Sequence, residues 1–85
     1  MKDKDINLLS YVKISENRTK ILKSMEKEMQ FPSLIAKSTK IRINQVSTTL
    51  KELKEKQLVE CINEKAKVGR FYQLTKKGNE IAKLL

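Results

Sequence analysis

The stretch INQVSTTLKELKEK, residues 43–56, places the strongest constraint on the fold. Its apolar residues recur at the spacing of one helical face: Ile43, Val46, Leu50 and Leu53. The opposite face opens with mediocre helix formers that carry uncharged hydrogen-bonding groups: Asn44, Gln45, Ser47 and Thr48. A merely solvated face would more often be built from Glu, Lys and Ala. The pattern therefore predicts a helix whose polar face contacts something.

A second, shorter helix is predicted just before this one, over residues 33–40. Pro32 suits its first turn and biases Phe31 toward an extended conformation. Two short helices joined by so tight a connection are typical of a helix-turn-helix. A longer helix is predicted upstream, from an N-cap at Ser15 to about Glu28. One side of that helix should carry Ile14, Arg18, Ile21, Leu22 and Met25.

The hydrophobic period changes after Lys56. Strand-forming residues precede and follow a polar turn over 63–69, which predicts a β-hairpin. These residues are Leu58, Val59, Cys61 and Ile62 before the turn, and Phe71, Tyr72 and Leu74 after it. Thr75 should cap a last helix with Ile81, Leu84 and Leu85 on its buried side. Near the N-terminus, residues 5–11 predict a helical turn with Asp5 as its cap.

Composition excludes several classes of protein. The chain has 85 residues, enough for one small domain, and 19 basic against 10 acidic residues give a net charge of +9. This surplus suits nucleic acid or an acidic membrane surface. We find no apolar run long enough for a membrane span and no signal peptide, so we expect a soluble cytoplasmic protein.

The chain offers little for metal or covalent chemistry. It contains no histidine and one cysteine, Cys61, which lies in an apolar run and should be a core residue. A zinc finger is excluded, and we expect no metal and no cofactor. Paired carboxylates, a phosphate-binding glycine loop and a nucleophile setting are also not found, so an enzyme is not expected.

The residues themselves resemble a family of small archaeal and bacterial transcriptional regulators of the MarR and ArsR type. The matching features are R-x-x-IL from Arg18, P-S-x-IA from Pro32, V-S-x-x-L-x-x-L from Val46, LV, GR-x-Y-x-LT from Gly69, and Gly78. The resemblance implies an α+β, mainly α, winged helix-turn-helix with a three-helix core, a β-hairpin wing and a C-terminal helix. It assigns residues 15–85 to this DNA-binding domain and leaves 1–14 as an N-terminal segment, a short helix or a dimer contact.

In helix-turn-helix proteins the N-terminal part of the second helix meets base edges in the major groove. For the helix over 43–56, Asn44 and Gln45 can pair with adenine, and Thr48 can contact thymine or a phosphate. Ser47 and Lys51 share or flank this face, and Arg42 is expected to hold a phosphate. Related regulators often carry Arg at the position of Thr48. The start of the preceding helix, at Ser33, can hold a phosphate through its amides and hydroxyl.

The predicted wing, residues 63–70, is the second candidate contact. The resemblance places it along the adjacent minor groove or backbone, with Lys65, Lys67 and Arg70 as the contacting residues. For the two lysines, the alternative is an ordinary solvated turn. For Arg70, the alternative is packing against the recognition helix, residues 43–56.

The expected partner is double-stranded DNA, bound with a sequence preference by a homodimer. The expected dimer contacts are Ile6, Leu8, Leu9 and Tyr11, together with Ile81, Leu84 and Leu85. No pocket for a small-molecule effector is evident. Two other functions remain open: a winged helix that binds protein, and a nonspecific chromatin-type DNA-coating protein.

Overall fold

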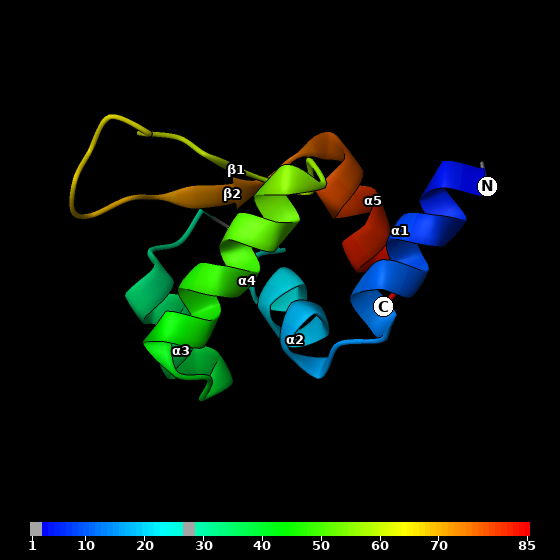
Figure 1. The fold of residues 1–85 in the computed structure, drawn as a ribbon, viewed down its shortest axis with the longest axis horizontal. Helices are drawn as coiled ribbons and strands as arrows, with labels where there is room; N and C mark the ends of the chain where they lie inside the picture. Colours follow the sequence, from blue (N-terminus) through cyan, green and yellow to red (C-terminus); the bar gives the residue numbers. More distant parts are fainter. Residues whose placement is uncertain (1–2, 27–28) are drawn as a thin grey trace.

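A computed structural model describes residues 3–26 and 29–85 of the chain (Figure 1). In chain order the elements are α1 (Asp3–Lys13), α2 (Glu16–Ser24), α3 (Pro32–Thr39), α4 (Ile43–Glu55), β1 (Val59–Cys61), β2 (Tyr72–Leu74) and α5 (Lys76–Lys83). Figure 1 shows α2, α3 and α4 as a central bundle, the hairpin extending past α3 on one side, and α1 beside α5 at the opposite end. The predicted architecture, mainly α with a β-hairpin wing, is confirmed.

The core lies between the three central helices. Ile21, Leu22 and Met25 of α2 are buried, as is Ile35 of α3. The apolar face predicted for α4 supplies its buried stripe, Val46, Leu50 and Leu53. Tyr72 and Ala36 are partly buried and pack against it.

Two residues predicted on buried helix faces are exposed. Ile14 is 79% exposed because it lies in the connection before α2, where helical periodicity no longer applies. Ile43 is 51% exposed because it occupies the first position of α4, beyond the packed stripe, and lines an open groove. The periodicity of the sequence therefore identifies the middle of each helix better than its ends.

The predicted caps define the helix starts. Ser15 Oγ accepts a hydrogen bond from the Arg18 amide at 3.3 Å, and Thr75 Oγ1 accepts one from the Gly78 amide at 3.0 Å. Phe31 is extended, with φ −77° and ψ 149°, and Pro32 occupies the first turn of α3 as predicted. At its other end α2 stops at Ser24, earlier than predicted, and the predicted end at Glu28 lies outside the described residues.

The turn between α3 and α4 is short because Lys40 adopts a left-handed conformation, with φ 60° and ψ 28°. This residue ends α3 and reverses the chain, and Ile41 is buried directly after it. Two residues later α4 begins, so the two helices form the predicted helix-turn-helix.

The hairpin is antiparallel, with Val59 opposite Leu74 and Cys61 opposite Tyr72. Gln30 joins its edge as an isolated bridge, through reciprocal 2.9 Å hydrogen bonds with Tyr72. Cys61 is half-buried, not a core residue as expected, because it lies at the end of β1 where the hairpin leaves the body.

The N-terminal segment is a longer helix than predicted. Asp5 lies inside α1 and does not cap it; its carboxylate pairs with Lys77 Nζ of α5 at 2.7 Å. Val12 is fully buried and joins the core. Leu84, predicted to be buried, is 47% exposed because it follows the last residue of α5.

Candidate nucleic-acid interface

An open groove of about 720 Å³ separates the start of α3 and the outer side of α4 from the wing, the loop over residues 62–71. We call it the wing groove. It brings together Ser33, Ser47, Lys51, Lys67 and Arg70, which the sequence predicted as contacts from three separate segments. The groove is also lined by Phe31, Pro32, Ile43, Lys54, Val68, Gly69 and Tyr72.

An aromatic contact lies beside this groove, between Phe31, which lines it, and Phe71. The rings of Phe31 and Phe71 lie with centroids 4.0 Å apart and an interplanar angle of 34°. Phe31 directly precedes α3, and Phe71 directly precedes β2. Their contact therefore fixes the base of the wing against the helix-turn-helix.

The other predicted residues of α4 lie outside the groove, on the exposed first turns of the helix. Arg42, Asn44, Gln45 and Thr48 are all exposed. Asn44 Oδ1 accepts from the Gln45 amide at 2.9 Å, and Thr48 Oγ1 donates to the Asn44 carbonyl at 3.0 Å. The amide nitrogen of Asn44 remains a donor, and its oxygen keeps a second lone pair.

The wing is shaped by its own hydrogen bonds. Asn63 Oδ1 accepts from the Phe71 amide at 2.8 Å, while its Nδ2 donates to the Gly69 carbonyl at 3.0 Å. Gly69 has φ +69°, a conformation that favours glycine. Arg70 Nε donates to the Ala66 carbonyl at 2.8 Å, so Arg70 bonds within the wing.

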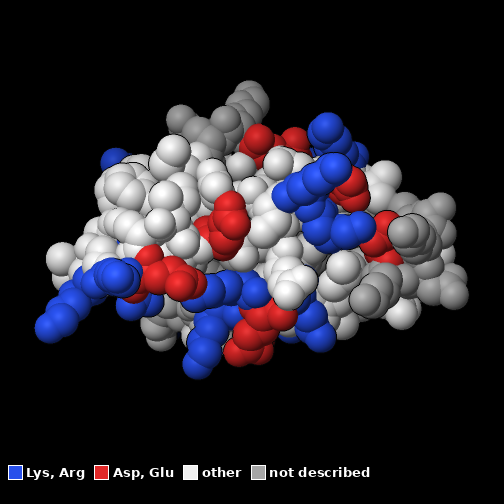
Figure 2. All heavy atoms as spheres, turned by 90° about the horizontal axis from the view of Figure 1, so that it is seen from above, with Lys and Arg blue, Asp and Glu red and all other residues white. Residues whose placement is uncertain are grey.

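Lys65 lies apart from the groove. It lines a separate cleft on the wing with residues such as Cys61 and Ala66. Figure 2, a view from above, shows lysine and arginine side chains projecting from the end of the molecule that the wing occupies, with acidic side chains close beside them.

Lys54 and Glu64 form a contact that the sequence did not predict. Lys54 Nζ lies 2.5 Å from Glu64 Oε1, which ties α4 to the base of the wing. The hydrogen bond from the Lys54 ammonium, reinforced by its charge, lowers the pKa of Glu64. The same hydrogen bond raises the pKa of Lys54. Both groups are therefore ionised around neutral pH, and Glu64 partly neutralises a lysine that lines the groove.

This contact predicts a pH dependence. Because the pKa of Glu64 is lowered on folding, its contribution to stability is complete above its ordinary pKa and is lost as the pH falls through the folded value. Carboxyl NMR should find Glu64 titrating below the ordinary pKa, and Lys54→Met should return it toward that value. A Glu64 pKa that is unchanged by Lys54→Met would contradict the contact.

Sequence reasoning missed further groove residues. Val68, in the wing, is 86% exposed and lines the groove, and Ile43 lines it from the start of α4. The signal available in the sequence was an apolar residue, Val68, within the polar turn over 63–69, since a solvated turn rarely carries a bare aliphatic side chain.

A helix-turn-helix followed by a hairpin wing, with a groove between them, defines a winged helix-turn-helix protein. No model of a protein family and no curated protein matches the sequence. Solved structures share the fold. Lactococcus lactis ZitR, a zinc-responsive MarR family member, is 26% identical with a TM-score of 0.70 over 81% of this chain and 49% of that chain. Wild-type ZitR in complex with DNA is 25% identical, with a TM-score of 0.68 over 79% of this chain and 47% of that chain.

A third similar structure covers nearly the whole of this chain. It is the homodimeric winged helix-turn-helix DNA-binding domain Mb0332 from Mycobacterium bovis, a possible ArsR-family regulator. It is 20% identical with a TM-score of 0.71, over 99% of this chain and 80% of that chain. This chain spans about half the length of the ZitR chains in the two comparisons above, 49% and 47%.

The described residues contain neither a metal-binding cluster nor a membrane-spanning helix. No three His, Cys, Asp or Glu side chains in residues 5–26 and 29–85 gather in a way that could hold a metal ion. Within the same ranges, no helix has the length and apolar character needed to cross a membrane.

Proposed function

We propose that this protein is a double-stranded DNA-binding transcriptional regulator with a sequence preference. The observation that carries the proposal is the wing groove, where the polar face of α4 and the basic wing border one open surface. The similarity in fold to ZitR, which has been solved with DNA, and to a winged helix-turn-helix DNA-binding domain supports it.

In this proposal the first turns of α4 enter the major groove. Asn44 and Gln45 are exposed there, and either amide can make a bidentate contact with adenine. Thr48 and Ser47 offer a methyl or hydroxyl group on adjacent positions. The acids Glu52 and Glu55 come later in the helix, where they do not repel the phosphates.

Phosphate contacts would flank this helix. Arg42, exposed at the N-cap of α4, and Ser33, in the first turn of α3, both adjoin helix N-termini that attract anions. Lys51, which lines the wing groove, would hold a phosphate from the middle of α4.

The wing would follow the adjacent minor groove or backbone, with Lys67 and Arg70 directed at the negative potential there. The bond from Arg70 Nε to Ala66 leaves the terminal guanidinium nitrogens to make this contact. Lys65, outside the groove, would contribute at longer range.

Removing a wing cation should weaken binding to every duplex. We expect Lys67→Ala or Arg70→Ala each to lower the slope of log affinity against log salt by about one unit. A variant with one phosphate contact fewer releases about one counterion fewer on binding. Fluorescence anisotropy at several salt concentrations measures this. Lys20→Ala, at an exposed position of α2 outside the wing groove, is the matched control and should leave the slope unchanged. An equal drop of the slope in all three variants would mean that net charge alone sets the slope and would contradict a specific contact by the wing.

We further propose that the protein acts as a homodimer through α1 and α5. These helices lie side by side at the end opposite the wing (Figure 1), where Ile6 and Leu84 are 48% and 47% exposed. Leu8, Leu9, Tyr11 and Leu85 are partly buried around them, whereas Ile81 is buried in the core and is not available to a partner. Two recognition helices about one DNA turn apart would read a palindromic site.

A further inference from the structure

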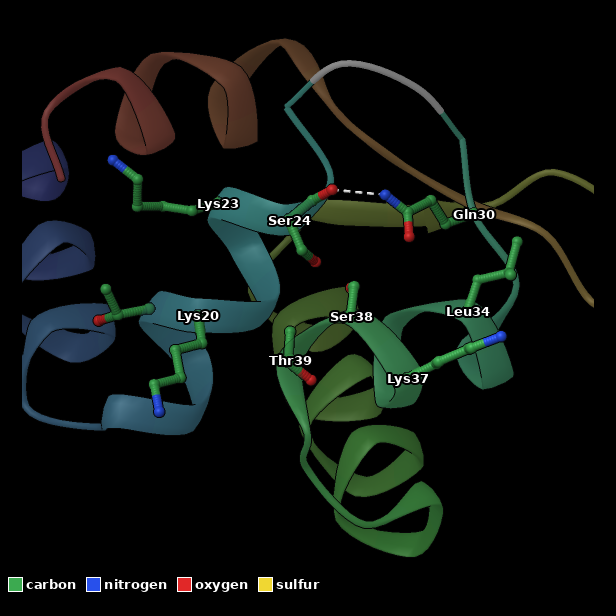
Figure 3. A pocket seen from close by; sticks show the side chains of 9 residues that line it. Lys20, Lys23, Ser24, Gln30, Leu34, Lys37, Ser38 and Thr39 are labelled. Carbon is green, nitrogen blue, oxygen red and sulfur yellow. Dashed lines mark hydrogen bonds between the residues drawn. The ribbon is translucent and has the colours of Figure 1, made fainter.

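A second groove, between α2 and α3, lies apart from the wing groove. It has a volume of about 870 Å³ and shares no lining residue with the wing groove. Its lining residues come from α2, the segment before α3, and α3 itself (Figure 3): Thr19, Lys20, Lys23, Ser24, Gln30, Leu34, Lys37, Ser38 and Thr39. We call it the helical groove. None of its lining residues belongs to α4 or to the wing, so the proposed function does not use it.

Lysines surround the helical groove. In Figure 3 the side chains of Lys20, Lys23 and Lys37 fan outward around its edge, and none of the described lining residues is an acid. Lys20 pairs with Glu16 at 3.0 Å and Lys23 with Glu26 at 4.0 Å. Both pairs are exposed on the surface of the protein, where water and salt weaken them. Carboxylates of a binding partner can therefore replace these glutamates at little cost.

The hydroxyl groups that line the helical groove donate their protons to backbone carbonyls of the protein itself. Ser24 donates to the Ile21 carbonyl at 2.6 Å, and Ser38 and Thr39 both donate to the Ile35 carbonyl, at 3.2 and 2.6 Å. Each hydroxyl oxygen is left as a hydrogen-bond acceptor. Gln30 also uses an amide proton internally, on the Ser24 carbonyl, as Figure 3 shows, which leaves its carbonyl oxygen as an acceptor.

An apolar contact completes the groove. Leu34 is 50% exposed on the side of α3 that faces it, and the aliphatic stems of the lysines extend the apolar surface. A ligand would gain by covering Leu34 with an apolar side chain.

We propose that the helical groove binds an acidic segment of a partner protein that also carries apolar side chains. The carboxylates would pair with the lysines at the edge, the backbone N–H groups would donate to the hydroxyl and Gln30 oxygens, and a leucine-like side chain would cover Leu34. A DNA backbone fits less well, because it has no N–H donors for the hydroxyl and Gln30 oxygens and no apolar side chain that could cover Leu34. The groove therefore gives the regulator a protein contact separate from its DNA surface.

The test uses the full chain and a short acetylated synthetic peptide of glutamate and leucine as the probe. In a ¹H–¹⁵N NMR titration we expect amide shifts confined to the helical groove, at residues such as Gln30, Leu34 and Ser38. Leu34→Ser and Lys37→Glu should each lower the affinity for the peptide by about tenfold. Both residues are exposed, so circular dichroism should find the fold unchanged. Lys65→Glu, an equal change of charge on the wing, is the control and should retain the affinity.

Several results would overturn the proposal. These are an absence of binding at millimolar peptide, shifts that map to the wing groove, or equal binding of a probe in which serine replaces leucine. DNA affinity, measured in parallel, should be unchanged by Leu34→Ser. If Leu34→Ser or Lys37→Glu lost DNA binding to the same extent as Lys67→Ala, the helical groove would belong to a nucleic-acid surface. If the unmodified protein binds the peptide but no DNA, the proposed function is contradicted and the proposal for the helical groove is not.

Discussion

Gly78→Ala is expected to destabilise the protein by about 3 kcal/mol, at the upper end of the cost of overpacking. Gly78 is buried in the first turn of α5, and a Cβ atom there would lie 1.9 Å from the Leu58 carbonyl oxygen and 2.9 Å from its carbon. Both are backbone atoms and cannot rotate away. The same carbonyl accepts a 3.0 Å hydrogen bond from the Thr75 amide, so moving it also disturbs the start of α5.

Thermal unfolding followed by circular dichroism measures this effect. For a chain of this size, we expect the midpoint to fall by more than about 10 °C. Asn79→Ala, the same residue introduced at the next, exposed position of α5, is the control and should change the midpoint little. A Gly78→Ala protein as stable as the Asn79→Ala protein would show that α5 and the segment before β1 are not in close contact.

Asn44→Ala is expected to reduce discrimination between a preferred site and random DNA by about 1 to 3 kcal/mol, roughly 5-fold to 150-fold. Asn44 is exposed, and within residues 3–26 and 29–85 its side chain bonds only to the neighbouring amide of its own helix, so its removal should not affect the fold. Gln45→Ala should act in the same direction. Competition experiments with specific and random duplexes measure the ratio of the two affinities.

The control for this prediction is Lys67→Ala, which should weaken both duplexes equally and leave their ratio intact. The two variants therefore separate base contacts from phosphate contacts. Identical behaviour of Asn44→Ala and Lys67→Ala on both duplexes would contradict the division of labour between α4 and the wing.

Local signals were enough to predict most elements of this fold. Ser15 and Thr75 cap helices as expected, Pro32 begins α3, and the change of period after Lys56 marks the hairpin. Each of these signals acts within a few residues, through a cap, a fixed φ or an alternating pattern. Burial at the ends of the apolar faces was less predictable. Ile43 and Leu84 follow the apolar pattern of their helices, but each lies at a helix end and is about half exposed.

The contacts between elements could not be predicted in the same way. The Lys54–Glu64 pair depends on how the hairpin bends back toward α4, and the placement of Arg70 depends on the turn through Ala66 and Gly69. The helical groove draws its residues from separate segments, and its acceptor character depends on where each hydroxyl proton is directed. Such features require the tertiary structure, because the sequence gives neither relative distance nor orientation.

The central claim, that α4 and the wing read double-stranded DNA, is tested most directly by selection from random duplexes. The purified protein is titrated against a selected pool and a matched unselected pool at several salt concentrations, and the stoichiometry is measured by ultracentrifugation. We predict an enriched site with two half-sites, bound by two chains with a steep salt dependence. Equal binding to both pools would indicate nonspecific DNA coating, and no binding at moderate salt would contradict DNA recognition altogether.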